Sequence, residues 1–335
     1  MTPQSLLLVT GASGLVGSHV CEQARELGLS VRALVRRGSD RRFLDTLGIE
    51  IAEGELRSPE SLAAAAKGVT HVVHCAARVG DWGPVAEYQR DNVDGVRNLL
   101  GAFRVNKRRP HFVHISSLGV YPARDHHQTD ETTPVNTAGI DGYTRSKVET
   151  EQAVLDFLKA EGGTAVILRP GFIYGPRDRN VLPRLVERIR GGKFAFLGSG
   201  RQLMNNTYVG NLVDAAFLAL DRPDLSGEAF NITDPRLVSK LEFVEGVCRA
   251  AGLPQPKKHA PLAVAKILAS TLDSIWRTLG RQSPPPVSQA AVKFMGYNLD
   301  YSIAKARGLL KYDPQFDFTD AMAHSLEAPA TRAAA

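Results

Sequence analysis

TGASGLVG, residues 10–17, joins a continuous apolar run over residues 6–10 to a helical stretch over residues 15–27. A parallel strand that is buried on both faces has such an apolar run, and Gly28 is a suitable end for the helix. Glycines at three-residue intervals let backbone N–H groups approach a diphosphate, and the helix dipole favours the anion. Because this turn lies between a strand and a helix, it predicts a dinucleotide site.

Strand-like apolar runs and helical stretches alternate outward from this turn. Further strands are expected over residues 31–35, 49–51, 71–75, 111–115 and 165–168, with helices over 91–105 and 143–160 between them. Such alternation predicts an α/β fold, here a Rossmann doubly wound parallel sheet with a smaller, mostly helical substrate domain. The dinucleotide-binding domain is expected over 1–175 plus about 205–234, the substrate-binding domain over 176–204 plus 235–327, and a frayed tail over 328–335.

The composition is that of an ordinary globular protein. Of the 335 residues, 43% are hydrophobic and 23% are charged, which excludes collagen, a coiled coil or overall disorder as the main state. The net charge of +6 is mild, and no aromatic residues are interleaved with the basic residues 107–109, so no nucleic-acid partner is expected. No apolar run is long enough to span a membrane, and the N-terminus lacks the pattern of a signal peptide.

The cysteines and histidines give no metal-ligand pattern. Cys21, Cys75 and Cys248 lie far apart, and an odd number is a poor framework for disulfides. We therefore expect no metal site and a reducing compartment, with the cytoplasm as the location. The adjacent His126 and His127 fall in a polar loop and are expected to be solvated.

The end of the second expected strand bears on the choice of cofactor. An enzyme that prefers NAD usually carries Asp or Glu there, to bind the ribose hydroxyls. Residues 33–37 read ALVRR, so no acid is present and Arg36 stands just past the strand. A guanidinium pairs well with a 2′-phosphate. The sequence therefore favours NADP, with NAD as the alternative.

A second motif concerns proton transfer. Tyr143 and Lys147 are four residues apart, so on a helix their side chains lie on one face. A tyrosine with a pKa near 10 is a poor base, but a nearby ammonium favours the phenolate. Ser117 ends the fifth expected strand, where it would orient a substrate oxygen toward Tyr143. These three residues are the candidate catalytic group for hydride transfer to or from a ketone or alcohol.

The glycine loop, the strand-end serine and the Tyr–Lys pair occur in the order and spacing of one family. To about residue 325, the chain resembles the extended branch of the short-chain dehydrogenase/reductases. The resemblance implies that Asn92 is a structural asparagine of the family. Glu55 stands where the family usually has Asp. The resemblance also implies a homodimer built on the helices over 91–105 and 143–160. With Arg36 from the cofactor argument, the expected cofactor contacts are Gly11, Ser13, Gly14, Leu15, Val16, Gly17, Arg36, Glu55, Leu56, Cys75, Ala76, Ala77, Tyr143, Lys147, Pro170 and Phe172.

Three segments bear on the reaction. Leu118 and Gly119 follow the serine, so the acidic pair of the sugar-nucleotide dehydratases is missing. Residues 204–209 lack the arginine common in epimerases, and residues 78–84 resemble a loop of the 3β-hydroxysteroid and sterol-4-carboxylate dehydrogenases and of 2-alkyl-3-ketoalkanoate reductases. The resemblance implies hydroxyl/ketone interconversion on an apolar small molecule, steroid- or sterol-like or a long-chain β-hydroxy/β-keto acid. A nucleotide-sugar epimerase and a non-catalytic NADP-sensing protein are the alternatives.

Apolar residues recur at helical spacing within residues 260–279. They are Val264, Leu268, Leu272, Ile275 and Leu279. Core packing is the favoured interpretation of this stripe, and a wall of the substrate site is an alternative. A peripheral membrane contact is a further alternative, weakened because Asp273 interrupts the pattern.

Overall fold

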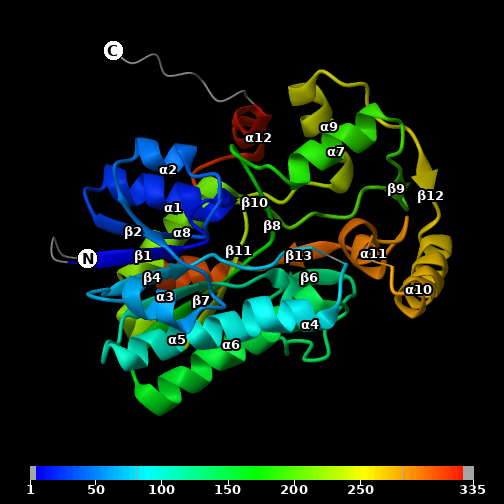
Figure 1. Ribbon diagram of the computed structural model, residues 1–335. Helices are drawn as coiled ribbons and strands as arrows, with labels where there is room; N and C mark the ends of the chain where they lie inside the picture. The colour runs from blue at the N-terminus through cyan, green and yellow to red at the C-terminus, as the bar shows by residue number, and fades with distance from the viewer. Residues whose placement is uncertain (1–4, 81, 282, 327–335) are drawn as a thin grey trace.

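A seven-stranded, all-parallel sheet forms the centre of the molecule (Figure 1). The structure is a computed structural model that describes residues 5–80, 82–281 and 283–326. The strand order is β11-β7-β5-β4-β1-β2-β3, so the order reverses between β1 and β4. The strands are β1 (Leu6–Thr10), β2 (Ser30–Val35), β3 (Glu50–Glu53), β4 (His71–His74), β5 (His111–Ile115), β7 (Thr164–Pro170) and β11 (Ala229–Ile232).

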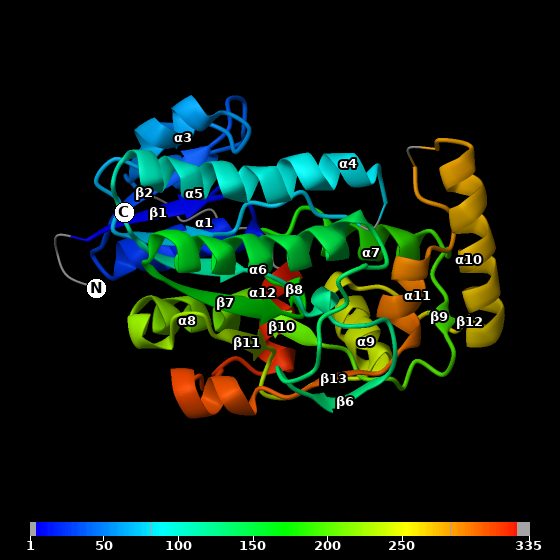
Figure 2. The ribbon, with the colours of Figure 1, turned by 90° about the horizontal axis from the view of Figure 1, so that it is seen from below.

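Helices cover both faces of this sheet, which explains why its central strands are apolar (Figure 2). One face packs against α1 (Leu15–Glu26) and α8 (Val209–Leu220), with α2 (Arg42–Thr46) beside α1. The other face packs against α3 (Pro59–Ala65), α5 (Gly95–Val105) and α6 (Gly142–Glu161). The predicted Rossmann doubly wound sheet is confirmed.

The rest of the chain forms a smaller part beside the carboxyl ends of the strands (Figure 1). It contains three short parallel strand pairs: β8 (Phe172–Tyr174) with β10 (Asn206–Tyr208), β9 (Phe196–Leu197) with β12 (His259–Ala260), and β6 (His126–Thr129) with β13 (Leu299–Tyr301). Its helices are α7 (Val181–Arg190), α9 (Lys240–Ala251), α10 (Leu262–Thr278) and α11 (Gln289–Gly296), while α12 (Phe318–Leu326) packs against α9. Between these segments the chain returns to the central sheet through α8 and β11.

The structure corrects the helix expected over residues 91–105. A short helix α4 (Val85–Tyr88) leads into a π-helical segment, Gln89–Asp94, and only then into α5. A π-helical turn is wider than an α-helical turn, so it shifts which side chains share one face of the helix. The spacing of apolar residues alone does not reveal such a turn. The expected frayed tail, 328–335, lies outside the described residues. Across residues 5–80, 82–281 and 283–326, none of the helices combines the length and hydropathy that a transmembrane span needs.

Two expectations about burial are wrong. The ring of His126 is buried, stacks on Tyr301 at 4.5 Å between centroids and lies 3.0 Å from the hydroxyl of Thr129, whereas His127 is exposed. The apolar stripe of α10 is not core: Val264, Leu268, Ile275 and Leu279 are exposed, although Leu272 is half-buried. The small residues Ala265 and Ala269 face the protein instead.

Candidate active site

The glycine loop between β1 and α1 leaves no room for side chains at two of its three glycines. Gly11 has a φ of +66°, and a Cβ there would lie 2.7 Å from the backbone nitrogen of Ala76. A Cβ at Gly17 would lie 2.7 Å from the carbonyl carbon of Gly11. Gly14 precedes α1 without a side-chain cap, and no acid lies in the first turn. These features fit a diphosphate at the N-terminus of α1, where an anion is favoured.

A cleft of about 590 Å³ opens beyond the ends of β2 and β3. Arg36 and Glu55 line it, and both side chains are exposed. The neighbouring Arg37 is already paired, with its Nε 2.9 Å from Glu53 Oε1, whereas no carboxylate of the described chain pairs with Arg36. Leu56 is half-buried against the cluster under α3 and α5. Arg36 is therefore the cation of this cleft that is available to a phosphate.

The segment after β4 lies directly against the glycine loop. The backbone N–H of Cys75 donates to the carbonyl of Thr10 at 3.2 Å, and that of Ala76 donates to the Thr10 hydroxyl at 3.3 Å. Ala76 and Ala77 are half-buried. Burial raises the pKa of the Cys75 thiol above its usual range, so the neutral thiol is not an activated nucleophile.

The predicted group of Ser117, Tyr143 and Lys147 comes together at the end of β5. Asp141 caps α6, since its Oδ1 accepts from the N–H of Thr144 at 2.7 Å, and the cap fixes the first turn that carries Tyr143. Lys147 is buried, and its Nζ donates to the carbonyl of Ile115 at 2.7 Å and lies 5.9 Å from the centroid of the Tyr143 ring.

Burial sets the protonation of this group in the unliganded protein. It raises the pKa of Tyr143 to about 12, against the opposing effect of a hydrogen bond with the Ser117 side chain. It lowers the pKa of Lys147 to about 8, although Cys75 and Glu151 act in the opposite direction. At neutral pH the phenol therefore holds its proton and the lysine is an ammonium, which is the state that donates a proton to a ketone oxygen.

Asn92 connects the π-helical segment to this group. Its side chain accepts from the N–H of Arg78 at 2.6 Å and donates to the Arg78 carbonyl at 3.1 Å and to Ser146 Oγ at 2.8 Å. Ser146 in turn donates to the carbonyl of Tyr143 at 2.8 Å. The loop after β4 and the first turn of α6 are thus held by one buried amide.

Two further supports of the site gave no signal in the sequence. Arg169 and Glu151 form a buried two-point ion pair, with Nη2–Oε2 at 2.7 Å and Nε–Oε1 at 3.0 Å, and Ser116 donates to Glu151 at 2.5 Å. Lys293, on α11, donates to the carbonyls of Gly119 and Tyr121. Their partners are 18 and 174 residues away in sequence, so no local pattern could reveal these contacts.

The last two expected cofactor residues lie where the sheet meets the smaller part. Pro170 is the final residue of β7, and Phe172 follows in β8. The Phe172 ring stacks on Phe294 at 4.7 Å and meets Phe243 edge-on at 5.4 Å. Phe172 is therefore part of an aromatic cluster within the smaller part, and its side chain is half-buried.

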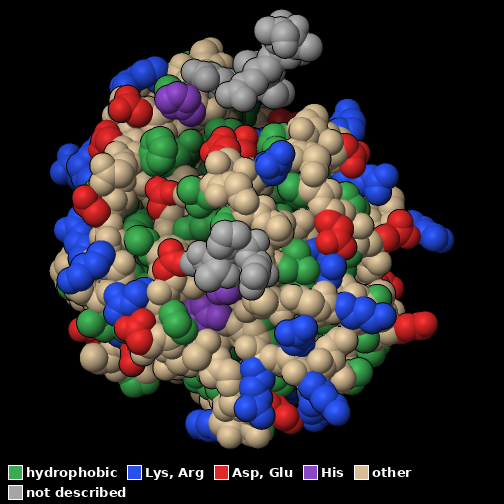
Figure 3. Space-filling view, turned by 90° about the vertical axis from the view of Figure 1, so that its left-hand side faces the viewer, with side chains coloured by type: hydrophobic (Ala, Val, Ile, Leu, Met, Phe, Trp, Pro, Cys, Tyr) green, Lys and Arg blue, Asp and Glu red, His purple; other side chains and the backbone are tan. Residues whose placement is uncertain are grey.

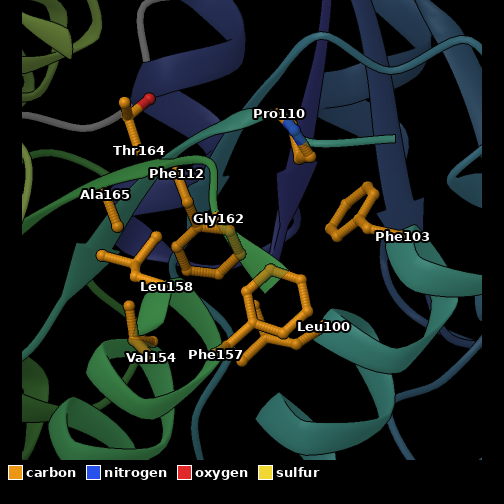
Figure 4. A pocket seen from close by; sticks show the side chains of 10 residues that line it. All are labelled: Leu100, Phe103, Pro110, Phe112, Val154, Phe157, Leu158, Gly162, Thr164 and Ala165. Carbon is orange, nitrogen blue, oxygen red and sulfur yellow. The ribbon is translucent and has the colours of Figure 1, made fainter. Parts of the chain in front are cut away.

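A hollow under α5 and α6 is not a ligand site. It holds only about 10 Å³, roughly one water, and apolar side chains line it (Figure 4). Among the described residues, no group of three or more His, Cys, Asp or Glu side chains could hold a metal ion.

Comparisons with known proteins find relatives that match nearly the whole chain. The 4-hydroxy-2-methyl-3-oxo-4-farnesyl-3,4-dihydroquinoline-1-oxide ketoreductase of Stigmatella aurantiaca is 32% identical, over 91% of this chain and 90% of that relative. The decarboxylating sterol-4-alpha-carboxylate 3-dehydrogenase of Mus musculus is 29% identical, over 95% of this chain and 89% of that relative. The crystal structure of gox2253 has a TM-score of 0.80 at 28% identity, over 96% of this chain and 97% of that chain.

The family itself follows from a match that spans most of the chain. Residues 7–233 match the model of the NAD dependent epimerase/dehydratase family, which takes in the glycine loop, the strand-end serine and the Tyr–Lys helix. The chain therefore belongs to the NAD dependent epimerase/dehydratase family and is an enzyme of the extended short-chain dehydrogenase/reductase type.

Proposed function

We propose that this enzyme interconverts a hydroxyl group and a ketone on an apolar small molecule, with NADP as the preferred cofactor. The proposal rests mainly on the proximity of three side chains beyond the end of β5. Ser117 hydrogen-bonds Tyr143, and Lys147 lies beside the Tyr143 ring. Ligands bind at the carboxyl ends of the strands in doubly wound sheets, where the order of the strands reverses.

The chain supplies the proton and the orientation. When bound, the nicotinamide donates or accepts the hydride. Tyr143 gives its phenolic proton to the ketone oxygen in reduction and takes the hydroxyl proton in oxidation. Ser117 hydrogen-bonds the same oxygen and orients it toward Tyr143. Lys147 is an ammonium at neutral pH, and it would favour the phenolate and hold the ribose hydroxyls of the bound cofactor.

The substrate class rests on the relatives and on the loop over residues 78–84. The names of two relatives contain a farnesyl group and a sterol carboxylate. We expect a steroid- or sterol-like alcohol or a long-chain β-hydroxy/β-keto acid. With a β-hydroxy acid as substrate, Tyr143 would take the hydroxyl proton and the bound cofactor would supply the hydride acceptor, and the resulting β-keto acid would lose carbon dioxide without further catalysis.

The preference for NADP rests on Arg36, which lines the 590 Å³ cleft and pairs with no carboxylate among the described residues. Residues 176–204 plus 235–327 are proposed to form the substrate-binding domain, and residues 1–175 plus about 205–234 the cofactor domain.

We further propose a cytoplasmic homodimer in which α5 and α6 of the two copies make a four-helix contact.

A substrate panel tests the activity. Purified enzyme is given NADPH with ketosteroids, long-chain β-keto acids and UDP-sugars, and NADPH absorbance and products are followed. NADPH oxidation with an apolar ketone supports the proposal. Conversion of a UDP-sugar without net cofactor turnover favours a nucleotide-sugar epimerase, the second candidate because the family includes such enzymes. Bound NADP without turnover of any substrate favours an NADP-sensing protein.

The variant Tyr143→Phe tests the assigned proton donor. We expect turnover to be lost while NADPH binding, measured by fluorescence, is retained, because only the hydroxyl is removed. Turnover at the wild-type rate would refute the role of Tyr143.

A further inference from the structure

Helix α10 presents an apolar face to solvent. Val264, Ile267, Leu268, Ile275 and Leu279 each expose between 44% and 69% of their surface. At about 100° per residue they fall on one side of the helix. The helix lies at the outer edge of the molecule in two perpendicular views, as far as possible from α1 and β2 (Figures 1 and 2). A contiguous apolar face of this kind marks an interaction site.

The stretch of chain that includes this face is mainly basic. Residues 254–281 contain five basic residues, Lys257, Lys258, Lys266, Arg277 and Arg281, and a single acid, Asp273. This stretch therefore carries four of the six net positive charges of the chain. The opposite side of the molecule differs, since Lys and Arg are mixed there with Asp and Glu (Figure 3).

Asp273 does not interrupt the exposed face. Its side chain is buried, and its Oδ2 accepts from the backbone N–H of Gln289 at 3.2 Å, so the carboxylate points toward α11. The exposed side of the helix therefore carries no acid. Asp273 therefore does not weigh against a membrane contact of this face.

Two of the cations on α10 contact aromatic rings of neighbouring segments. The Nζ of Lys266 lies 4.4 Å from the centroid of the Tyr297 ring, and the guanidinium of Arg277 lies 5.0 Å from that of the Trp82 ring. An apolar stripe with Lys and Arg on the adjoining polar face is the arrangement of helices that lie in a lipid interface.

We propose that α10 docks this enzyme on an anionic lipid surface, with its apolar face in the headgroup layer. A second copy of the chain is a poorer occupant, because a symmetric contact would bring the basic side chains of both copies together without an acid between them. An anionic lipid surface complements both features, because its acyl boundary takes the apolar face and its headgroups attract the positive charge.

The docked helix would adjoin the loop that follows β4, which carries Trp82. Trp82 Nε1 donates to the carbonyl of Arg281 at 3.0 Å, just beyond α10, and the Trp82 loop follows the Cys75–Ala77 segment. An apolar substrate could thus pass from lipid to the site without crossing water. This last step rests on the proposed function, whereas docking on lipid does not.

Vesicle flotation with the full chain tests the docking. The enzyme is expected to float with vesicles of phosphatidylcholine mixed with phosphatidylglycerol, less with phosphatidylcholine alone, and less again in high salt. Ile267→Asp and Leu279→Asp should each weaken binding about tenfold or more, because a carboxylate enters the apolar face. Lys257→Gln should weaken it about fivefold.

Leu27→Asp is the matched control. Leu27 is 58% exposed directly after α1, on the side of the molecule away from α10, so this variant gains the same charge and should bind vesicles like the wild type. Wild-type protein that does not float, or Asp variants that float equally well, would overturn the proposal. So would a dimer that Ile267→Asp converts to monomers in sedimentation, because α10 would then be an interface between copies.

Activity separates this proposal from the previous one. Ile267→Asp should keep wild-type kcat with a water-soluble ketone, since the residue lies outside the site. If no substrate is turned over but vesicle binding depends on α10, the proposed function fails and the docking stands.

Discussion

Lys293 donates a hydrogen bond of 2.9 Å from its Nζ to the carbonyl oxygen of Gly119, in the turn that follows Ser117. The same ammonium donates to the carbonyl of Tyr121 at 2.9 Å. Burial lowers its pKa to about 8, so at neutral pH it is charged and holds both carbonyls. A residue of α11 thus positions the loop that carries the candidate active-site serine.

We expect Lys293→Met to lower kcat about tenfold or more, because two buried carbonyls lose their donor and Ser117 shifts. The KM for the cofactor should change little. Lys305→Met is the control, since Lys305 also donates to a backbone carbonyl, that of Ala229 at 2.9 Å, but lies away from the serine loop. Steady-state kinetics and thermal unfolding of both variants check this. Equal loss of kcat in both would contradict a specific role for Lys293.

The pH profiles of the two reaction directions should differ. Burial raises the pKa of Tyr143 to about 12 in the free enzyme, so the phenol is protonated at neutral pH and reduction has its proton donor. Oxidation needs the phenolate, so its kcat/KM should rise by up to about tenfold per pH unit below the effective pKa. Initial rates in both directions between about pH 6 and 9 check this. An oxidation rate that does not change with pH would contradict Tyr143 as the base.

Arg36→Ala should weaken NADP binding about 10- to 100-fold and NAD binding far less, because only NADP carries the 2′-phosphate. Arg37→Ala is the matched control. Arg37 has the same charge one residue away, but it pairs with Glu53. Calorimetric titration of both cofactors into the three proteins measures the differences. An equal loss for NADP and NAD in Arg36→Ala would remove the argument for an NADP preference.

The sequence was sufficient to predict the sheet and the assembly of the candidate site. Continuous apolar runs mark strands such as β1 and β5, and the turn at Gly11–Gly17 has few conformations open to it, so local patterns determine these elements. Ser117, Tyr143 and Lys147 could be grouped because a parallel sheet brings strand ends and the following helices to one edge.

Contacts between distant segments could not be predicted in this way. The spacing of Val264, Leu268 and Ile275 defines one face of a helix but not what lies against it, so the spacing predicts core packing for side chains that are in fact exposed. For the same reason, the sequence does not reveal that the Asp273 side chain points into the protein, or that Lys293 donates a hydrogen bond to the loop after Ser117. Which charged side chains become buried depends on how whole helices and strands pack together. The periodicity of the sequence does not contain this information.

Gly17→Ala should damage both the fold and the cofactor site. The new Cβ would lie 2.7 Å from the carbonyl carbon of Gly11 and 2.8 Å from Cα of Ala12, which are backbone atoms that cannot rotate away. The loop must therefore shift, at a cost of about 1–3 kcal/mol in unfolding free energy, as overpacking costs elsewhere. The N–H groups at the start of α1 move with it, so cofactor affinity should fall as well.

Gly101→Ala separates this clash from the general effect of adding a methyl group. Gly101 lies within α5 with nothing within 4 Å of an added Cβ, so alanine should stabilise the protein by about 0.5–1 kcal/mol. Denaturant unfolding and cofactor titration of both variants would measure these changes, and a Gly17→Ala protein as stable and as tight-binding as Gly101→Ala would show that the loop does not need its third glycine.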